Sequence, residues 1–109
     1  QLYNLTQKGR IIMSITEIKI RRAFAEGRLK AVVSVTLDNC IAIHELKIIQ
    51  GNDRLFVAMP SRMDDNGVFR DIIHPITFGT REAIESAVLN AYYRYNEVNS
   101  LMRSNEITA

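Results

Sequence analysis

The sequence predicts an α+β fold, an antiparallel β-meander of four to five strands with a C-terminal helix packed on one face. Three observations indicate this fold. Apolar and polar residues alternate with a period of two in four segments, the connections between these segments are short and rich in turn residues, and apolar residues recur at helical spacing near the C-terminus. A sheet with one apolar face needs a cover, which the helix can supply.

The four alternating segments are expected to form the strands. The short sequences FAEG, DN and QGND connect them, so each neighbouring pair is expected to form an antiparallel hairpin. Turns of this kind determine the register, and a slip of one residue would move every side chain to the other face. The predicted strands are residues 15–23, 28–37, 40–49 and 54–60.

The three turns, taken separately, pair Ile18 with Val33, Val33 with His44 and Leu46 with Val57. These registers agree, because together they bring the apolar side chains to one face. That face is predicted to hold Ile18, Ile20, Leu29, Ala31, Val33, Val35, Leu46, Ile48, Leu55, Val57 and Met59.

The covering helix is predicted to begin at Thr80, a good N-cap residue, with Glu82 near its positive end. Its apolar stripe is expected to contain Ile84, Ala87, Val88, Ala91, Tyr92, Tyr95 and Val98.

Residues 13–99 are therefore expected to form a single α+β domain. Residues 1–12 match no later pattern and precede Met13, so we interpret them as an expression scar or upstream extension. Residues 100–109 are expected to be a frayed C-terminal tail.

Composition favours a soluble cytoplasmic module without a membrane partner. The chain has 14 Lys+Arg and 12 Asp+Glu, and removing Lys8 and Arg10 with the first segment leaves 12 of each. Net charge therefore gives no general reason to expect a nucleic-acid partner. Cys40 is the single cysteine, which excludes an internal disulfide, and no run of residues reaches the length of a membrane span.

The signs of catalysis are weak, and we expect no enzyme activity, no metal and no cofactor. Cys40 and His44 share a face, but four residues along a strand separate them by about 13 Å, too far for a thiol–imidazole pair. His44 is expected to be a core histidine bonded to the backbone. No zinc-ligand spacing, P-loop or nucleophile elbow is present.

The second face of the sheet is predicted to be partly basic. Arg21 is expected opposite Lys30, a like-charge pair that costs a little stability. Lys19 lies on the same face, with Arg22 and Arg28 near the hairpin tip. The apolar residues there allow two interpretations, a solvated face with stray apolar side chains or a partner surface, most simply for a second copy. That surface would comprise Val32, Ile41, Ile43 and Phe56.

The segment MPSRMDDNGVFRDIIHPITFG lies between the last strand and the helix. DDNG is typical of a turn, so Arg62 and Arg70 are expected on the two arms of a short hairpin. One interpretation is an ion pair of either arginine with Asp64, Asp65 or Asp71. The other is that both guanidinium groups face outward as phosphate clamps. The two are compatible, because an acidic neighbour can orient an arginine.

Four strings, IRRAFAEGRLKAVVSVTLDN, LFVAMPSR, NGVFRDIIHPI and TREAIESAVLNAYYR, resemble the stage V sporulation protein G family of bacterial septation regulators. The resemblance extends from about Met13 to Arg94. It implies a cytoplasmic homodimer that binds DNA and RNA, regulates septation, sporulation and gene expression, and catalyses no reaction.

The resemblance also assigns residues. The implied nucleic-acid-binding residues are Lys19, Arg21, Arg22, Arg28, Lys30, Arg62 and Arg70, although Lys19 and Lys30 rest on their predicted face alone. Asp71 and the His74-Pro75 pair also match family positions. Met63 replaces a residue that is commonly basic in the family, which would weaken phosphate attraction.

Two alternatives remain open. The chain could be a protein–protein adaptor of the division or regulatory machinery, docking a regulatory protein through the apolar surface defined above. A small-molecule or enzymatic role at His74 and Asp71 is the third hypothesis, with no nucleophile or metal set to support it.

Overall fold

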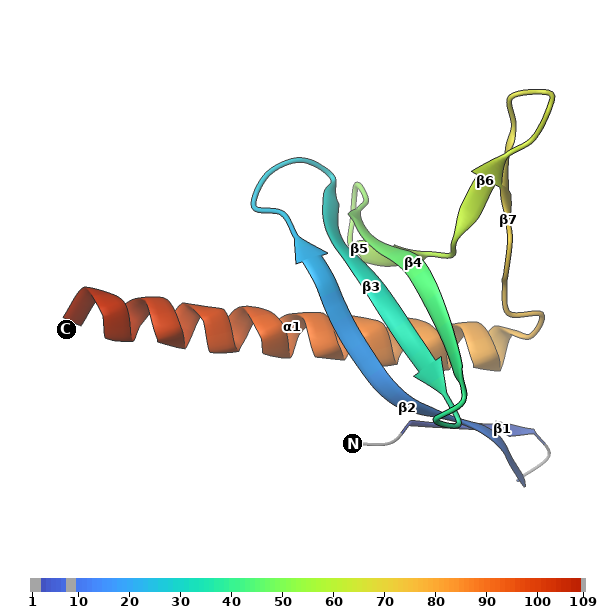
Figure 1. The fold of residues 1–109 in the computed structure, drawn as a ribbon, viewed down its shortest axis with the longest axis horizontal. Helices are drawn as coiled ribbons and strands as arrows, with labels where there is room; N and C mark the ends of the chain where they lie inside the picture. Colours follow the sequence, from blue (N-terminus) through green and yellow to red (C-terminus); the bar gives the residue numbers. More distant parts are fainter. Residues whose placement is uncertain (1–2, 8–9, 109) are drawn as a thin grey trace.

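A computed structural model of the chain describes residues 3–7 and 10–108. Five strands form one antiparallel sheet in sequence order, a two-stranded ribbon follows, and a helix completes the fold (Figure 1). The α+β prediction is confirmed. The elements are β1 (Tyr3–Gln7), β2 (Arg10–Ala23), β3 (Leu29–Leu37), β4 (Ile41–Gln50), β5 (Leu55–Ala58), β6 (Ser61–Met63), β7 (Phe69–Asp71) and α1 (Phe78–Thr108).

Strand β1 lies in the segment 1–12, which is outside the domain predicted from the sequence. It pairs with the start of β2, from Tyr3 opposite Ile15 to Gln7 opposite Arg10. The interpretation of this segment as a scar or extension stays a prediction, and its residues 1–2 and 8–9, including Lys8, lie outside the described residues.

All three registers differ from the predicted ones by two residues. Ile18 pairs with Val35 rather than Val33, Val33 with Leu46 rather than His44, and Ile48 with Val57 rather than Leu55. An even displacement keeps each side chain on its predicted face. Most of the apolar face was therefore predicted correctly although the pairs were wrong. Leu29 is an exception, because it pairs with Ile49, the neighbour of the core residue Ile48.

Strand β4 contains a β-bulge that the alternation did not reveal. Val33 pairs with Leu46 and Val35 with Ile43, so one residue of β3 faces both His44 and Glu45 of β4. Glu45 adopts a positive φ of 70°. Before the bulge the faces are exchanged, so Ile43 packs on the core. The prediction of a core histidine is wrong, because His44 is exposed on the other face.

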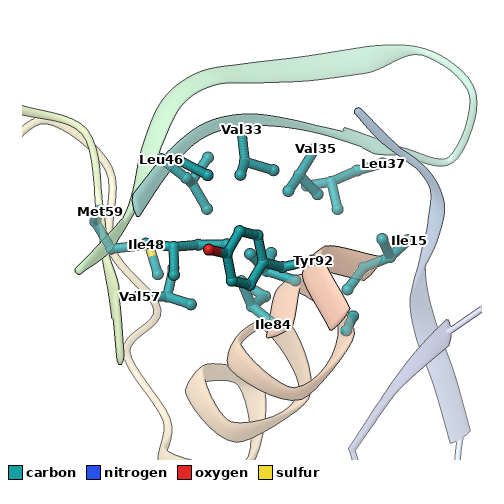
Figure 2. Packing of buried hydrophobic residues seen from close by; sticks show 13 residues of the cluster. Ile15, Val33, Val35, Leu37, Leu46, Ile48, Val57, Met59, Ile84 and Tyr92 are labelled. Atoms are coloured by element: carbon teal, nitrogen blue, oxygen red, sulfur yellow. The ribbon is translucent and has the colours of Figure 1, made fainter. Parts of the chain in front are cut away.

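The core lies between the sheet and α1 (Figure 2). Each large apolar side chain removed from water there contributes about 1.5–3 kcal/mol. The buried residues are Ile15, Ala31, Val33, Val35, Leu37, Leu46, Ile48, Val57, Met59, Ile84, Ala87, Val88 and Tyr92.

Both ends of α1 differ from the prediction. The helix begins at Phe78, and the backbone N–H of Thr80 donates to Thr77 Oγ1 at 3.2 Å, so Thr77 rather than Thr80 is the N-cap. The helix also continues through Thr108, into the expected tail, of which Ala109 is outside the described part. Tyr95 and Val98, expected in the core, are 36% and 50% exposed.

Candidate nucleic-acid interface

The β6–β7 ribbon presents two arginines directly opposite each other. Arg62 and Arg70 are cross-strand partners in its register. The ribbon extends away from the five-stranded sheet (Figure 1). Its turn closes with the N–H of Gly67 donating to the carbonyl oxygen of Asp64 at 3.0 Å, and Gly67 has a φ of 80° that favours glycine. The predicted hairpin with one arginine on each arm is confirmed.

Asp64 organises this ribbon. Arg70 Nε donates to Asp64 Oδ2 at 2.7 Å, and the backbone N–H groups of Asn66 and Val68 donate to Asp64 Oδ1 at 2.9 and 3.0 Å. The Arg70 hydrogen bond, followed by that of the Val68 N–H, holds the pKa of Asp64 below its ordinary value. The interpretation that a carboxylate pins the hairpin is confirmed for Arg70.

Arg62 differs from Arg70 in this respect. It is exposed, and among the described residues it forms no ion pair. The ribbon also carries an open concave surface of about 620 Å³, to which both arginines contribute. Its lining residues are Arg62, Met63, Asp64, Asp65, Arg70, Asp71 and Ile72.

A second cluster lies on the face of the sheet that α1 does not cover, which we call the open face. Arg21 Nε donates to Ser34 Oγ at 3.0 Å, and Ser34 Oγ shares a 2.8 Å hydrogen bond with His44 Nδ1. Ser34 is a buried polar residue, 5% exposed. Sequence reasoning missed this cluster. A signal existed, since Ser34 is a lone polar residue between Val33 and Val35.

The predicted pair of Arg21 and Lys30 is wrong. An irregularity between Ile20 and Arg22 removes Arg21 from the β2–β3 register, and Arg22 pairs with Val32. Arg21 therefore turns to Ser34 instead.

The remaining predicted cations lie on β2 and β3 or in the connection between them. Lys19 Nζ lies 4.0 Å from Glu17, Arg28 Nε donates to the carbonyl oxygen of Gln50 at 3.1 Å, and Lys30 is half-buried. The structure thus brings the predicted cations into two groups, one on β2 and β3 and one on the ribbon, which project from different parts of the molecule (Figure 1).

The predicted apolar partner surface does not form one patch. Val32 and Phe56 are half-buried, and Ile43 packs against the core. Ile41 pairs with the core residue Leu37 and is 56% exposed. The β4 bulge is the reason, because it turns Ile41 and Ile43 to the side of the sheet that α1 covers.

Other kinds of site receive little support. Within residues 3–7 and 10–108, no three side chains of His, Cys, Asp or Glu are grouped as metal ligands would be. His74 and Asp71 are both exposed. In the same part of the chain, no helix combines the length and apolarity that crossing a bilayer requires.

Comparisons with known proteins agree with the resemblance drawn from the sequence. A sequence model of the SpoVG family matches residues 13–94. Proteins named "Putative septation protein SpoVG" from Bacillus cereus (strain AH187) and Bacillus anthracis (strain A0248) are each 46% identical over 89 residues, which cover 82% of this chain and 92% of theirs. The chain therefore belongs to the SpoVG family.

Proposed function

We propose that this protein is a nucleic-acid-binding regulator, linked to septation and sporulation, that acts as a dimer through arginine–phosphate contacts. The septation link follows from the names of its relatives. The single observation that supports nucleic-acid binding is the presentation of guanidinium groups on two exposed surfaces, the open face and the ribbon.

The hydrogen bond from Arg21 to Ser34 suits a phosphate contact. Its Nε atom is held by the neutral hydroxyl of Ser34, which orients the guanidinium group without offsetting its charge. No carboxylate among the described residues lies within ion-pair distance of Arg21. A planar donor group that is oriented and still fully charged can bind phosphate through two hydrogen bonds.

Backbone contact is favoured over base reading. Of the exposed aromatic residues, Phe69 lies on the ribbon, Phe78, Tyr93 and Tyr95 lie on α1, and Phe24, 38% exposed, lies in the β2–β3 connection between Arg22 and Arg28. The open face adds the half-buried Phe56. Stacking platforms for successive bases are therefore sparse, and arginine–phosphate contacts dominate the proposed interface.

The test is a salt titration of binding to duplex DNA and to RNA, followed by fluorescence anisotropy. Log affinity for duplex DNA is expected to fall with log salt by about 0.9 per neutralised phosphate. Arg21→Ala combined with Arg62→Ala is expected to reduce both the affinity and this slope.

Arg54→Ala is the matched control for the double variant. It also removes a guanidinium group, but Arg54 Nη1 is already bonded to Glu85 of α1 at 2.8 Å, on the covered side of the sheet. For Arg54→Ala, the slope of log affinity against log salt should equal that of the parent. The proposal is contradicted if the affinity of the parent does not change with salt. It is also contradicted if Arg54→Ala lowers the affinity as much per cation removed as the Arg21→Ala, Arg62→Ala double variant does.

A protein–protein adaptor is the second candidate. Large apolar side chains are exposed along the ribbon and the start of α1, where Phe69, Ile72, Ile76 and Phe78 are 66%, 64%, 89% and 79% exposed. Such side chains suit a protein partner. Capture of a regulatory protein that survives moderate salt, and that is lost in Phe69→Asp but kept in the arginine variants, would favour this function.

A further inference from the structure

Strand β2 is a sheet edge over much of its length. Strand β1 pairs with it only from Arg10 to Ile15. Across the described residues, no strand pairs with the outer side of residues 16–23. The unpaired N–H and C=O groups of such an edge are a template for another strand.

The groove beside this edge is mainly apolar, with Thr16, Glu17 and Arg94 at its border. Helix α1 crosses the sheet and continues beyond β2 (Figure 1). Ile18 and Ile20 of β2, together with Ala91, Tyr95 and Val98 of α1, line a groove of about 510 Å³. Tyr95 and Val98 continue the core stripe of the helix, yet they remain 36% and 50% exposed.

The charges along the edge are self-complementary. Glu17 and Lys19 are exposed and flank Ile18, which packs towards the core. If two β2 strands pair antiparallel about a two-fold axis at Ile18, each Glu17 lies opposite the Lys19 of the other copy. An axis at Lys19 would place two lysines opposite each other, although it would also bring each Glu17 opposite an Arg21, and an axis at Ile20 would oppose Lys19 and Arg21. Of the three, the axis at Ile18 is the one that forms two opposite-charge pairs and no like-charge pair, so charge favours it.

The ends of the free edge agree with this register. Pairing about Ile18 uses residues 16–20. On one side β1 occupies the edge up to Ile15, and on the other the strand becomes irregular between Ile20 and Arg22. The available length and the charge pattern thus point to the same centre.

We propose that a second copy of this chain adds its β2 antiparallel to residues 16–20, with the two-fold axis at Ile18, and that each α1 covers Ile18 and Ile20 of the other copy. This inference rests on the dimer of the proposed function and identifies its surface. The contact uses the same residues on both copies, as two-fold symmetry requires. It also brings Lys19 and Arg21 of both copies to one continuous open face.

The first test is the solution mass, measured by light scattering over a dilution series. The parent is expected to be a dimer. Val98→Asp introduces a charge into the groove and is expected to weaken the dimer at least about tenfold. Tyr93→Asp is the matched control, because Tyr93 is 51% exposed and borders a different hollow of α1 with Asn96 and Glu97.

A charge exchange tests the register without touching the core. Glu17→Lys alone and Lys19→Glu alone each place like charges opposite each other twice, and each is expected to weaken the dimer roughly 2- to 30-fold. The double variant Glu17→Lys with Lys19→Glu restores both pairs and should restore the dimer.

A monomeric parent overturns the inference. So does a dimer that Tyr93→Asp weakens as much as Val98→Asp, or a double charge variant no better than its singles. Because these masses are measured without nucleic acid, the outcomes are separable. A dimer without affinity for DNA or RNA leaves this inference and removes nucleic-acid binding. A monomer that binds DNA removes this inference together with the dimer and leaves nucleic-acid binding.

Discussion

The two arginine groups differ in what holds the guanidinium. On the open face, Arg21 is bonded to the hydroxyl of Ser34, and in the ribbon, Arg70 is bonded to the carboxylate of Asp64. Both contacts orient an arginine, but only the carboxylate offsets its charge. A phosphate would meet the full charge of Arg21, whereas at Arg70 it must compete with Asp64. Orientation and available charge are thus separate properties of an anion site.

The largest expected effect is at Arg21. Arg21→Ala should weaken binding to duplex DNA about tenfold at low salt, since a charge-assisted hydrogen bond and its charge are lost. Arg70→Ala should weaken it only about threefold, because Asp64 already offsets part of that charge. Anisotropy titrations on both variants make the comparison. Equal losses would show that the neutral and acidic partners are equivalent.

A gain of affinity is expected when the carboxylate is removed. Asp64→Asn should tighten binding about threefold at low salt, because Arg70 no longer has a charged internal partner. Asp65→Asn is the control. It removes the same charge from the same turn, but Asp65 forms no ion pair among the described residues. If both variants gain affinity equally, the loss of one negative charge from the turn, rather than the release of Arg70, explains the gain.

The hydroxyl on the open face is expected to contribute modestly to stability. Ser34→Ala removes the hydrogen bonds to Arg21 and His44 and should lower the free energy of unfolding by about 1 kcal/mol, measured by urea denaturation. In a double-mutant cycle with Arg21→Ala, part of that loss should disappear. Fully additive losses would mean that Ser34 does not hold Arg21.

The smallest expected effect is the pH response of the ribbon. Because the folded state lowers the pKa of Asp64, its hydrogen bonds contribute fully above the pKa of the unfolded chain. That contribution is lost as the pH falls below about 4 and through the lower folded pKa. The amide resonance of Val68 reports this titration, and Asp64→Asn should abolish it. A folded pKa at or above the ordinary value would contradict the bonding described here.

The sequence predicted the fold because two periodicities dominate it. Alternation gave the apolar face of β2, β3 and β5, and helical spacing gave the buried side of α1 as far as Tyr92. Errors of two residues in register did not matter, since the side-chain period of a strand is also two. The hairpin carrying Arg62 and Arg70 could be predicted equally well, because the residues that determine a turn are local in the sequence.

The open-face cluster was not predictable in the same way. It depends on an irregularity at Arg21 and on the bulge at His44 and Glu45, each an extra residue that alternation cannot detect. Strand β1 was not predicted for a different reason, because its residues precede Met13 and match no later pattern in the chain. The end of the core stripe was misjudged because the helix extends beyond the sheet, and local spacing contains no information on the width of a sheet.

The bulge in β4 has a consequence for how the length of this strand can vary. Deleting one residue at positions 44–45 would leave a single residue opposite Ser34, restore regular pairing with β3 and keep Ile43 opposite Val35 on the core side. A one-residue deletion between Ile41 and Ile43 has no such extra residue to remove and would displace Ile41 from its pairing with Leu37. Homologous chains without the bulge are therefore expected to have one residue fewer between the Asp38-Asn39 turn and Leu46, with the same apolar residues on the core.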